Sequence, residues 1–321
     1  MKEFQAGEGI SGELTREERR QADQIRDSID ISDSQMILMY AAGAKQNIAD
    51  LSASILQSVK NADFERTGDL LSELLETLKE TETPGSVLRL PFISLCPRRR
   101  ARLLLEKTGR LENRVDRIAG KLDEARTDLL RDIGVLDMMY EKNIKYFRKL
   151  QIYITAGEEK VKQLTDKTIP ELKKKTQAGD NQIEMQKVLD AENAAALLEK
   201  TLLGLKTSSM MALQSIPQLR LIQNSENQLA DRIQTALQHT IPLWKSRMAV
   251  VINSLRGKEA QEEKGKASGS AQVQFRKANA ELFHAVQETA QMQIKEVSRR
   301  EKAKETLAQI EETLRKTGER R

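Results

Sequence analysis

The sequence predicts an all-α fold: an elongated antiparallel bundle of long helices with coiled-coil character and a small N-terminal helical hairpin. Aromatic side chains make up only 3% of the 321 residues and charged side chains 31%. Such a chain cannot fill a wide core, but it can fill the narrow seam of a bundle. Glycine and proline are scarce, at 16 and 6 residues. Apolar residues recur three and four positions apart, which is the period of a helix with one buried face.

The first 30 residues are expected to form a tail and a short polar helix. Residues 1–12 are predicted to be a disordered tail. Thr15 and Glu18 fit a capping box, in which each side chain accepts a hydrogen bond from the other residue's backbone. We therefore expect a helix that starts near Thr15 and ends at about Asp27.

Residues 31–80 are predicted to form a helical hairpin. Asp33 or Ser34 can cap a first helix, and Asp63 a second one. The first helix has an apolar stripe made of Ile37, Ala41, Ala44, Ile48, Leu51, Ile55 and Val59. The second has inward-facing leucines at Leu70, Leu71, Leu74, Leu75 and Leu78. Because the link from Lys60 to Asp63 is short, the two helices are expected to pack antiparallel.

Residues 81–97 are rich in proline and are expected to be a linker, since prolines and a glycine interrupt the helical pattern there. The long-helix bundle is assigned to residues 98–317. Its first helix is predicted from about Arg98 to Thr165, with weak points or kinks at Gly157 and Pro170. The stripe of this helix is Leu111, Val115, Ile118, Leu122, Ala125, Leu129, Ile133 and Leu136.

Two more long helices complete the predicted bundle. One starts after Gly179, is interrupted or restarted at Pro217 and kinks at Pro242. Its apolar positions are Ile183, Val188, Leu198, Leu202 and Leu205, then Ile222, Leu229, Ile233, Leu237, Ile241, Trp244, Met248, Val251 and Leu255. Residues 257–272 are expected to be a loop or a frayed segment, and a last polar helix is expected at 273–316.

Charge and composition narrow the function classes. The net charge is +5, from 53 basic and 48 acidic residues, so most charges are expected to solvate helix faces. Nucleic-acid binding is disfavoured because the net charge is mild and stacking aromatics are few. A coiled coil that did bind nucleic acid would show a steep salt dependence. The single cysteine, the lack of a signal-peptide pattern and the lack of about 18 consecutive apolar residues favour a soluble cytoplasmic protein. Peripheral contact with the inner face of the membrane stays open.

The side chains that enzymes use do not converge in this sequence. His239 and His284 are the only histidines and do not have the spacing of metal ligands. A glycine-rich phosphate loop and a Cys-x-x-Cys pair are absent from the sequence, so reduction of an oxyanion by a dithiol is unsupported. We expect a protein that is not an enzyme, with no catalytic residues, no cofactor and no metal.

One basic cluster is more specific. Arg98, Arg99, Arg100 and Arg102 lie at the start of the predicted long helix, directly after Cys96. Cations oppose the helix dipole at this end, and a bound anion would compensate for them. Anionic lipid headgroups are an alternative ligand, and the positive charge could also make the Cys96 thiol reactive. The interpretation we prefer is a flexible basic linker with an incidental cysteine.

Three segments resemble blocks of the TelA family, also called the toxic-anion-resistance family. They are residues 36–80, residues 129–158 and residues 215–255. The third is the most specific, through the signature positions Pro217, Thr240, Pro242, Trp244 and Lys245. The chain ends at Gly318–Arg321, where members of the family usually continue the helix. The resemblance implies a cytoplasmic bacterial protein associated with resistance to tellurite and other toxic agents, and it supplies no catalytic residues.

These observations favour a non-enzymatic cytoplasmic scaffold or adaptor that contributes to resistance to toxic anions and to envelope stress. Its expected partners are proteins of unknown identity, and a homo-oligomer stays open. The alternative is direct binding of an oxyanion or of anionic lipid at Arg98–Arg102. Trp244 is expected to be a core residue beside the Pro242 kink, with a partner-docking anchor as the other interpretation.

Overall fold

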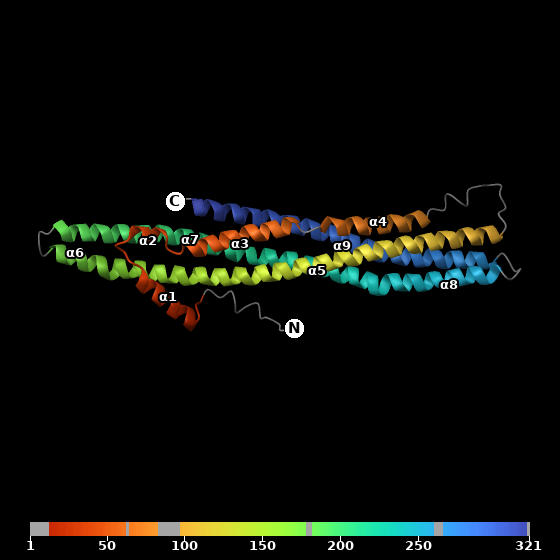
Figure 1. Ribbon diagram of the computed structural model, residues 1–321, viewed down its shortest axis with the longest axis horizontal. Helices are drawn as coiled ribbons and strands as arrows, with labels where there is room; N and C mark the ends of the chain where they lie inside the picture. Colours follow the sequence, from red (N-terminus) through yellow and green to blue (C-terminus); the bar gives the residue numbers. More distant parts are fainter. Residues whose placement is uncertain (1–12, 62–63, 83–96, 178–181, 260–265, 320–321) are drawn as a thin grey trace. The chain divides into compact units, whose positions relative to one another are not determined.

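The computed structural model describes residues 13–61, 64–82, 97–177, 182–259 and 266–319, and within these ranges every regular element is a helix (Figure 1). The predicted all-α class is therefore confirmed. The α-helices are α1 (Arg16–Ser28), α2 (Ser34–Leu38), α3 (Ala42–Asn61), α4 (Phe64–Glu82), α5 (Pro97–Gln163), α6 (Ile169–Gln177), α7 (Gln182–Thr235), α8 (Ile241–Glu259) and α9 (Lys266–Glu319). Residues 1–12, expected to be disordered, and residues 83–96 of the expected linker lie outside the described residues.

The chain divides into two compact units. Unit 1 comprises residues 1–60, 135–221 and 302–321, and unit 2 comprises residues 61–134 and 222–301. The helices α5, α7 and α9 contribute residues to both units. Nearly all of α3 belongs to unit 1 and α4 to unit 2, although the sequence grouped both in one N-terminal hairpin.

The expected capping box is present at the start of α1. The Glu18 backbone N–H donates to Thr15 Oγ1 over 3.2 Å, and the Thr15 N–H donates to Glu18 Oε2 over 2.8 Å. Since the motif depends on residues only three positions apart, local sequence was enough to find it.

The prediction of a single helix from Asp33 to Val59 is wrong, because the helical conformation is interrupted between α2 and α3. Asp33 caps α2 as expected, accepting hydrogen bonds from two backbone N–H groups. Ala41 then takes a left-handed backbone conformation with φ 55°, which costs a residue with a Cβ about 1 kcal/mol. Next to this turn, the buried Tyr40 donates a hydrogen bond to the carbonyl oxygen of Tyr153 over 2.7 Å. A contact with a distant part of the chain therefore accompanies the break.

The long helix α5 starts at Pro97, a position that suits proline because the first helical N–H groups have no partner anyway. All eight positions of its predicted stripe, from Leu111 to Leu136, are buried. Gly157 does not weaken the helix, contrary to expectation. Instead it admits neighbours: a Cβ at this position would lie 2.5 Å from Leu202 Cδ2 and 3.3 Å from the Tyr40 ring.

Two kinks expected at prolines are π-turns, that is, single wide helical turns. They are Leu164–Thr168 and Ala236–Thr240, and each is followed by isoleucine and proline. Ile169 donates its N–H to the carbonyl of Leu164, and Ile241 donates to that of Ala236. Proline has no N–H and its ring clashes with the carbonyl four residues before it, so a wider turn relieves the conflict at Pro170 and Pro242.

Pro217 behaves differently, and the interruption expected there is wrong. The helix α7 runs from Gln182 to Thr235 with Pro217 in its interior. Pro217 lies on the exposed side of the helix, where water can replace the backbone hydrogen bond that proline cannot make. Ile183, expected on the inward stripe, is exposed, whereas Val188, Leu198, Leu202 and Leu205 are buried.

The core of unit 2 is organised around Trp244, which is only 2% exposed. Its indole Nε1–H donates to Asn279 Oδ1 over 2.8 Å, which satisfies the polar atom of the buried ring. Its neighbours in the core come from α4, α5, α7, α8 and α9 and include Leu74, Ile118, Leu229, Met248 and Leu282. Trp244 is therefore a core residue, and the docking-anchor interpretation is excluded.

The last helix is longer than the sequence predicted. The helix α9 begins at Lys266 and ends at Glu319, and α8 continues to Glu259. Residues 257–259 and 266–272 are therefore helical, where a loop or a frayed segment was expected. Residues 266–272 are mostly Ala, Lys, Ser and Gln, and of these Ala, Lys and Gln favour a helix even without a buried stripe.

Candidate functional site

The basic start of α5 is only partly described. Arg98, Arg99 and Arg100 form the first helical turn after Pro97, but their side chains, like all of Cys96, lie outside the described residues. Arg102 is exposed. The anion, lipid and reactive-thiol hypotheses for this cluster therefore stay predictions.

The histidines do not form a site. His239 lies in the second π-turn and His284 on α9, and both are exposed. Within the described ranges, acidic, cysteine and histidine side chains form no group of three or more that could hold a metal ion.

The signature positions are structural where the structure describes their contacts. Pro217, Thr240 and Pro242 belong to the helix interior and π-turn described above. Lys245 of α8 forms an ion pair with Asp116 of α5. Lys245 and Trp244 therefore join α8 to α5 and α9 within unit 2.

The most unusual polar group in unit 2 is a buried ion network that joins α7 to α9. It comprises Ser225, Glu226, Glu296, Arg299 and Arg300. The side chains of Glu226 and Arg300 are 0% and 5% exposed, and Arg300 Nη1 donates to Glu226 Oε1. Ser225 Oγ donates to Glu296 Oε2, and Arg299 Nη1 donates to Glu296 Oε1 over 2.8 Å. Buried charges of this kind are tolerated only when they are paired and hydrogen-bonded.

Burial controls the electrostatics of this network. It raises the pKa of Glu226 to about 7, even though the positive charge and hydrogen bond of Arg300 act in the opposite direction. Burial also raises the pKa of Asp132, against the favourable charge of Arg300. Glu226 Oε2 is buried and has no hydrogen-bond partner. The raised pKa of Glu226 therefore follows from its burial, which the ion pair with Arg300 only partly offsets.

Sequence reasoning missed this network, although one signal was present. Glu226 falls on the inward stripe, four residues after Ile222 and three before Leu229. A charged residue at such a position is either misassigned or paired inside the core. Its partner could not be named, because Arg300 lies 74 residues further along the chain.

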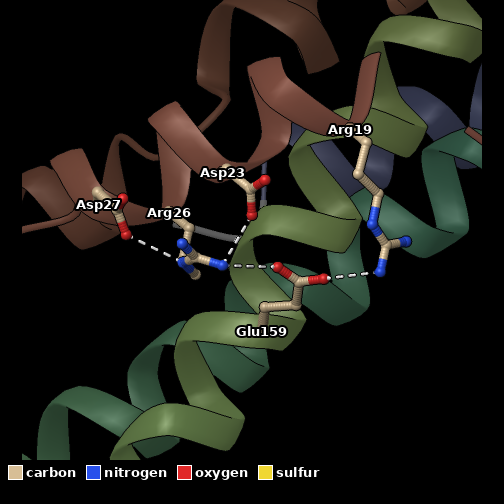
Figure 2. A network of polar contacts seen from close by, with 5 residues as sticks. All are labelled: Arg19, Asp23, Arg26, Asp27 and Glu159. Atoms are coloured by element: carbon tan, nitrogen blue, oxygen red, sulfur yellow. Dashed lines mark hydrogen bonds and ion pairs between the residues drawn. The ribbon is translucent and has the colours of Figure 1, made fainter. Parts of the chain in front are cut away.

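In unit 1, a second polar network fastens α1 to α5 (Figure 2). Arg26 contacts Glu159 of α5 over 3.1 Å, Asp23 over 2.8 Å and Asp27 over 3.0 Å. Arg19 reaches the other carboxylate oxygen of Glu159 over 3.4 Å. Glu159 therefore sits between two arginines of α1, and Figure 2 shows it pointing from α5 toward both.

An apolar contact lies beside these ion pairs. Ala22 of α1 is buried with Ile152 and Ala156 of α5, and Leu14 and Ile25 pack against this cluster. Small side chains on both helices allow a close approach, so apolar and polar contacts together fix the short α1.

Unit 1 also contains an open groove of about 500 Å³ where α5, the following π-turn and α7 meet. Its acidic lining residues are Glu158, Asp166 and Glu199, and its basic ones are Lys162 and Lys206. Lys206 forms an ion pair with Glu158 over 2.6 Å. The apolar part of the lining includes Leu202 and Leu203.

Next to the groove, α7 carries an exposed apolar face that we call the α7 stripe. Its members lie on one side of the helix and are all exposed: Met185, Leu189, Ala196, Leu203, Met210, Pro217 and Leu221. Leu189, Ala196, Leu203, Met210 and Pro217 recur at every seventh residue, as the seam of a coiled coil does. Leu203 is 67% exposed. The sequence pattern predicted only the inward stripe of this helix.

None of the helices in the described part of the chain combines the length and the apolar character that crossing a bilayer requires.

Most of the chain is similar to known proteins. Residues 22–269 match the family model described as "Toxic anion resistance protein (TelA)". The uncharacterized protein Lmo1967 of Listeria monocytogenes is 32% identical over 310 residues, which cover 95% of this chain and 77% of that protein. The uncharacterized protein YaaN of Bacillus subtilis is 33% identical, with 84% and 71% covered. A TelA-like protein of Staphylococcus aureus is 32% identical, with 77% and 66% covered. No solved structure matches the chain.

Proposed function

This chain belongs to the TelA family of toxic anion resistance proteins, and on that premise we propose that it contributes to such resistance as a non-enzymatic helical scaffold. It acts in the cytoplasm, with peripheral contact at the inner membrane face, and supports tolerance of anions such as tellurite and of envelope stress. It does so by holding partner proteins, and it does not transform the anion.

The α7 stripe is the observation that carries this proposal. Large apolar side chains scattered singly over a surface need no explanation, but a contiguous apolar face marks an interaction site. The α7 stripe presents Met185, Leu189, Leu203 and Met210 on one side of a single helix. A scaffold requires such a surface, and its spacing suits a second amphipathic helix.

The contacts around this surface support a preorganised helix. In unit 1 the opposite side of α7 is packed through Leu198, Leu202 and Leu205. Gln151 of α5 donates a hydrogen bond to Ser209 Oγ of α7 over 2.7 Å. A surface held in place in this way loses little conformational freedom on binding, which favours affinity.

The test is tellurite tolerance in cells that lack the chromosomal gene and carry a plasmid copy. Leu203→Lys places a charge on the α7 stripe and is expected to lower tolerance to the level of the empty plasmid. Ile294→Lys is the matched control, since Ile294 of α9 is also 67% exposed and lies off the stripe; it is expected to leave tolerance intact. Full tolerance with Leu203→Lys would remove the α7 stripe from the function.

A separate measurement tests the proposal that the protein does not transform the anion. Purified protein incubated with tellurite and cellular reductants is expected to leave the tellurite concentration unchanged. Consumption of tellurite at a rate that saturates with its concentration would contradict the proposal.

A second candidate is direct binding of an oxyanion or of anionic lipid at Arg98–Arg102. The start of α5 at Pro97 favours it, because free backbone N–H groups then lie beside the arginines. Titration calorimetry with tellurite and pelleting with anionic liposomes test it, with Arg98, Arg99 and Arg100 changed to Gln as the control. This candidate would be favoured if the wild-type protein releases heat with tellurite or pellets with anionic liposomes and the variant does neither. For the thiol hypothesis, unchanged tolerance in Cys96→Ser would exclude a reactive cysteine.

A further inference from the structure

We infer that the α7 stripe is the interface of an antiparallel homodimer, with Leu203 of each copy at the two-fold axis. The inference rests on the scaffold function proposed above for the surface that it uses, and it names the occupant of that surface. The arrangement of apolar residues, the charges beside them and the neighbouring groove support a second copy of this chain.

The α7 stripe is symmetric about Leu203. Ala196 and Met210 lie seven residues on either side of it, and Leu189 and Pro217 lie fourteen. Met185 and Leu221 lie 18 residues on either side, which is five full helical turns. A two-fold interface requires a surface that complements itself. When two copies run antiparallel about Leu203, each apolar position meets an apolar position of the second copy.

The charged residues beside the α7 stripe also fit a two-fold axis at Leu203. Along the groove side of the stripe, Glu199 precedes Leu203 by four residues and Lys206 follows it by three. A two-fold axis perpendicular to the helices keeps the same edge of both stripes on the same side. It therefore brings Glu199 of one copy opposite Lys206 of the second copy, and the reverse. On the other edge Lys200 comes opposite Thr207, so like charges do not face each other.

The groove beside the α7 stripe offers a surface that a second copy of α7 can cover. The groove of about 500 Å³ shares Glu199, Leu203 and Lys206 with this surface. In the dimer, α7 of the second copy covers the groove, and apolar atoms of Leu202 and Leu203 leave water. The polar lining then forms a rim around an apolar centre, as in other protein interfaces.

Analytical ultracentrifugation of the purified full chain gives the first test. The wild-type chain is expected to sediment as a dimer whose dissociation constant rises about 30-fold or more in Leu203→Lys. Ile294→Lys, with the same exposed fraction, is expected to sediment like the wild type. Circular dichroism confirms that each variant keeps its helical content. A wild-type chain that remains monomeric at all concentrations would overturn the inference.

Cysteine cross-linking tests the direction of the helices. In a Cys96→Ser background, Leu203→Cys is expected to form a disulfide-linked dimer with itself. Met185→Cys and Leu221→Cys are expected to link to each other when the two variants are mixed. Neither is expected to link to itself, because the two-fold axis separates like positions by about 54 Å. Self-linking of Met185→Cys would show a parallel pairing and overturn the antiparallel geometry.

Charge reversal tests the pair across the axis. Glu199→Lys is expected to weaken the dimer. Adding Lys206→Glu together with Glu158→Lys is expected to restore it, because the pair across the axis and the ion pair of Lys206 with Glu158 inside each copy are then both reversed. Glu288→Lys, at an exposed position of α9, is the control and is expected to leave the dimer unchanged. Failure of the added changes to restore dimerisation would show that Glu199 and Lys206 do not meet.

The outcomes for dimer and function can be told apart. A monomeric wild type whose Leu203→Lys variant loses tellurite tolerance would leave the scaffold proposal in place with a different partner, and would overturn the homodimer. A dimeric wild type whose monomeric Leu203→Lys variant keeps full tolerance would support the homodimer and overturn the scaffold proposal.

Discussion

At the scale of single residues, Glu226 is the least expected feature of unit 2. The Glu226 carboxylate lies in an apolar stripe, where the ion pair with Arg300 favours its charged form but burial disfavours it and raises the pKa to about 7. An isolated buried charge would be far more costly. The result is a side chain whose ionisation changes in the physiological pH range.

The pH dependence of stability follows from this pKa. In the unfolded chain Glu226 titrates near 4.5 and in the folded chain near 7, so the folded state binds the additional proton between these values. Its contribution is therefore fully present below about pH 4.5 and is lost as the pH rises through about 7. We expect it to reach at most about 3 kcal/mol.

The measurement compares wild type with Glu226→Gln, which keeps the shape and can still accept from Arg300. Urea unfolding followed through Trp244, the only tryptophan and a core residue of unit 2, reports on this unit. The difference in unfolding free energy between the two proteins is expected to change between pH 4.5 and 7. A difference that is constant across this range would contradict the raised pKa.

Gly157 gives a second prediction at the residue scale. Gly157→Ala gains about 1 kcal/mol of helix propensity, but its Cβ would lie 2.5 Å from Leu202 Cδ2. Overpacking of this kind costs about 1–3 kcal/mol, so we expect a net loss of about 1 kcal/mol. Gly120→Ala, also in α5, has no atom within 4 Å of the new Cβ and is expected to stabilise the protein. Thermal unfolding of the two variants checks this, and equal shifts in both would refute the close approach.

At the scale of elements, α1 depends on Glu159 of α5 for its position. The ion pairs of Glu159 with Arg19 and Arg26 are partly exposed, so each contributes little to the stability of the whole protein. Glu159→Ala is expected to loosen α1 while leaving the rest of the protein folded.

Hydrogen exchange resolves this prediction, because it reports on each element separately. Amides of Arg16–Ser28 are expected to exchange about tenfold faster in Glu159→Ala. Glu17→Ala is the control, since its ion pair with Arg20 lies within α1 at 4.0 Å. If the α1 amides exchange at the same rate in both variants, the ion pairs shown in Figure 2 do not hold α1 in place.

The elements also show which features the sequence could predict. The capping box at Thr15 and an irregularity of the helix at Pro242 depend on residues a few positions apart, so local patterns predicted both, although the predicted kink at Pro242 is a wide turn in the structure. The turn at Ala41 accompanies the Tyr40 contact with Tyr153, which lies 113 residues away along the chain. Nothing in the local pattern around Ala41 signals that contact, and a continuous helix was the natural expectation.

At the scale of the whole molecule, the apolar period predicted the all-α class and the long helices. It could not separate the two stripes of α7, because Leu202 and Leu203 look alike in sequence although one is buried and the other exposed. Nor could it divide the chain into units 1 and 2, since α5, α7 and α9 continue without a break in helical pattern from one unit to the other. Which apolar face remains free is decided by contacts between distant segments.

The two units differ in the features that they contain. The buried ion network and Trp244 lie inside unit 2 and join its helices to one another. Unit 1 fastens α1 and presents the α7 stripe, which is the surface through which we propose that this TelA family member acts.

Site-specific cross-linking in living cells tests this claim most directly. A photoactivatable amino acid replaces Leu203 in one strain and Ile294, equally exposed but off the stripe, in another. After growth with tellurite and irradiation, the account predicts a covalent protein adduct at position 203 and none at position 294. An absence of adducts at position 203, in cells that keep full tellurite tolerance, would contradict it.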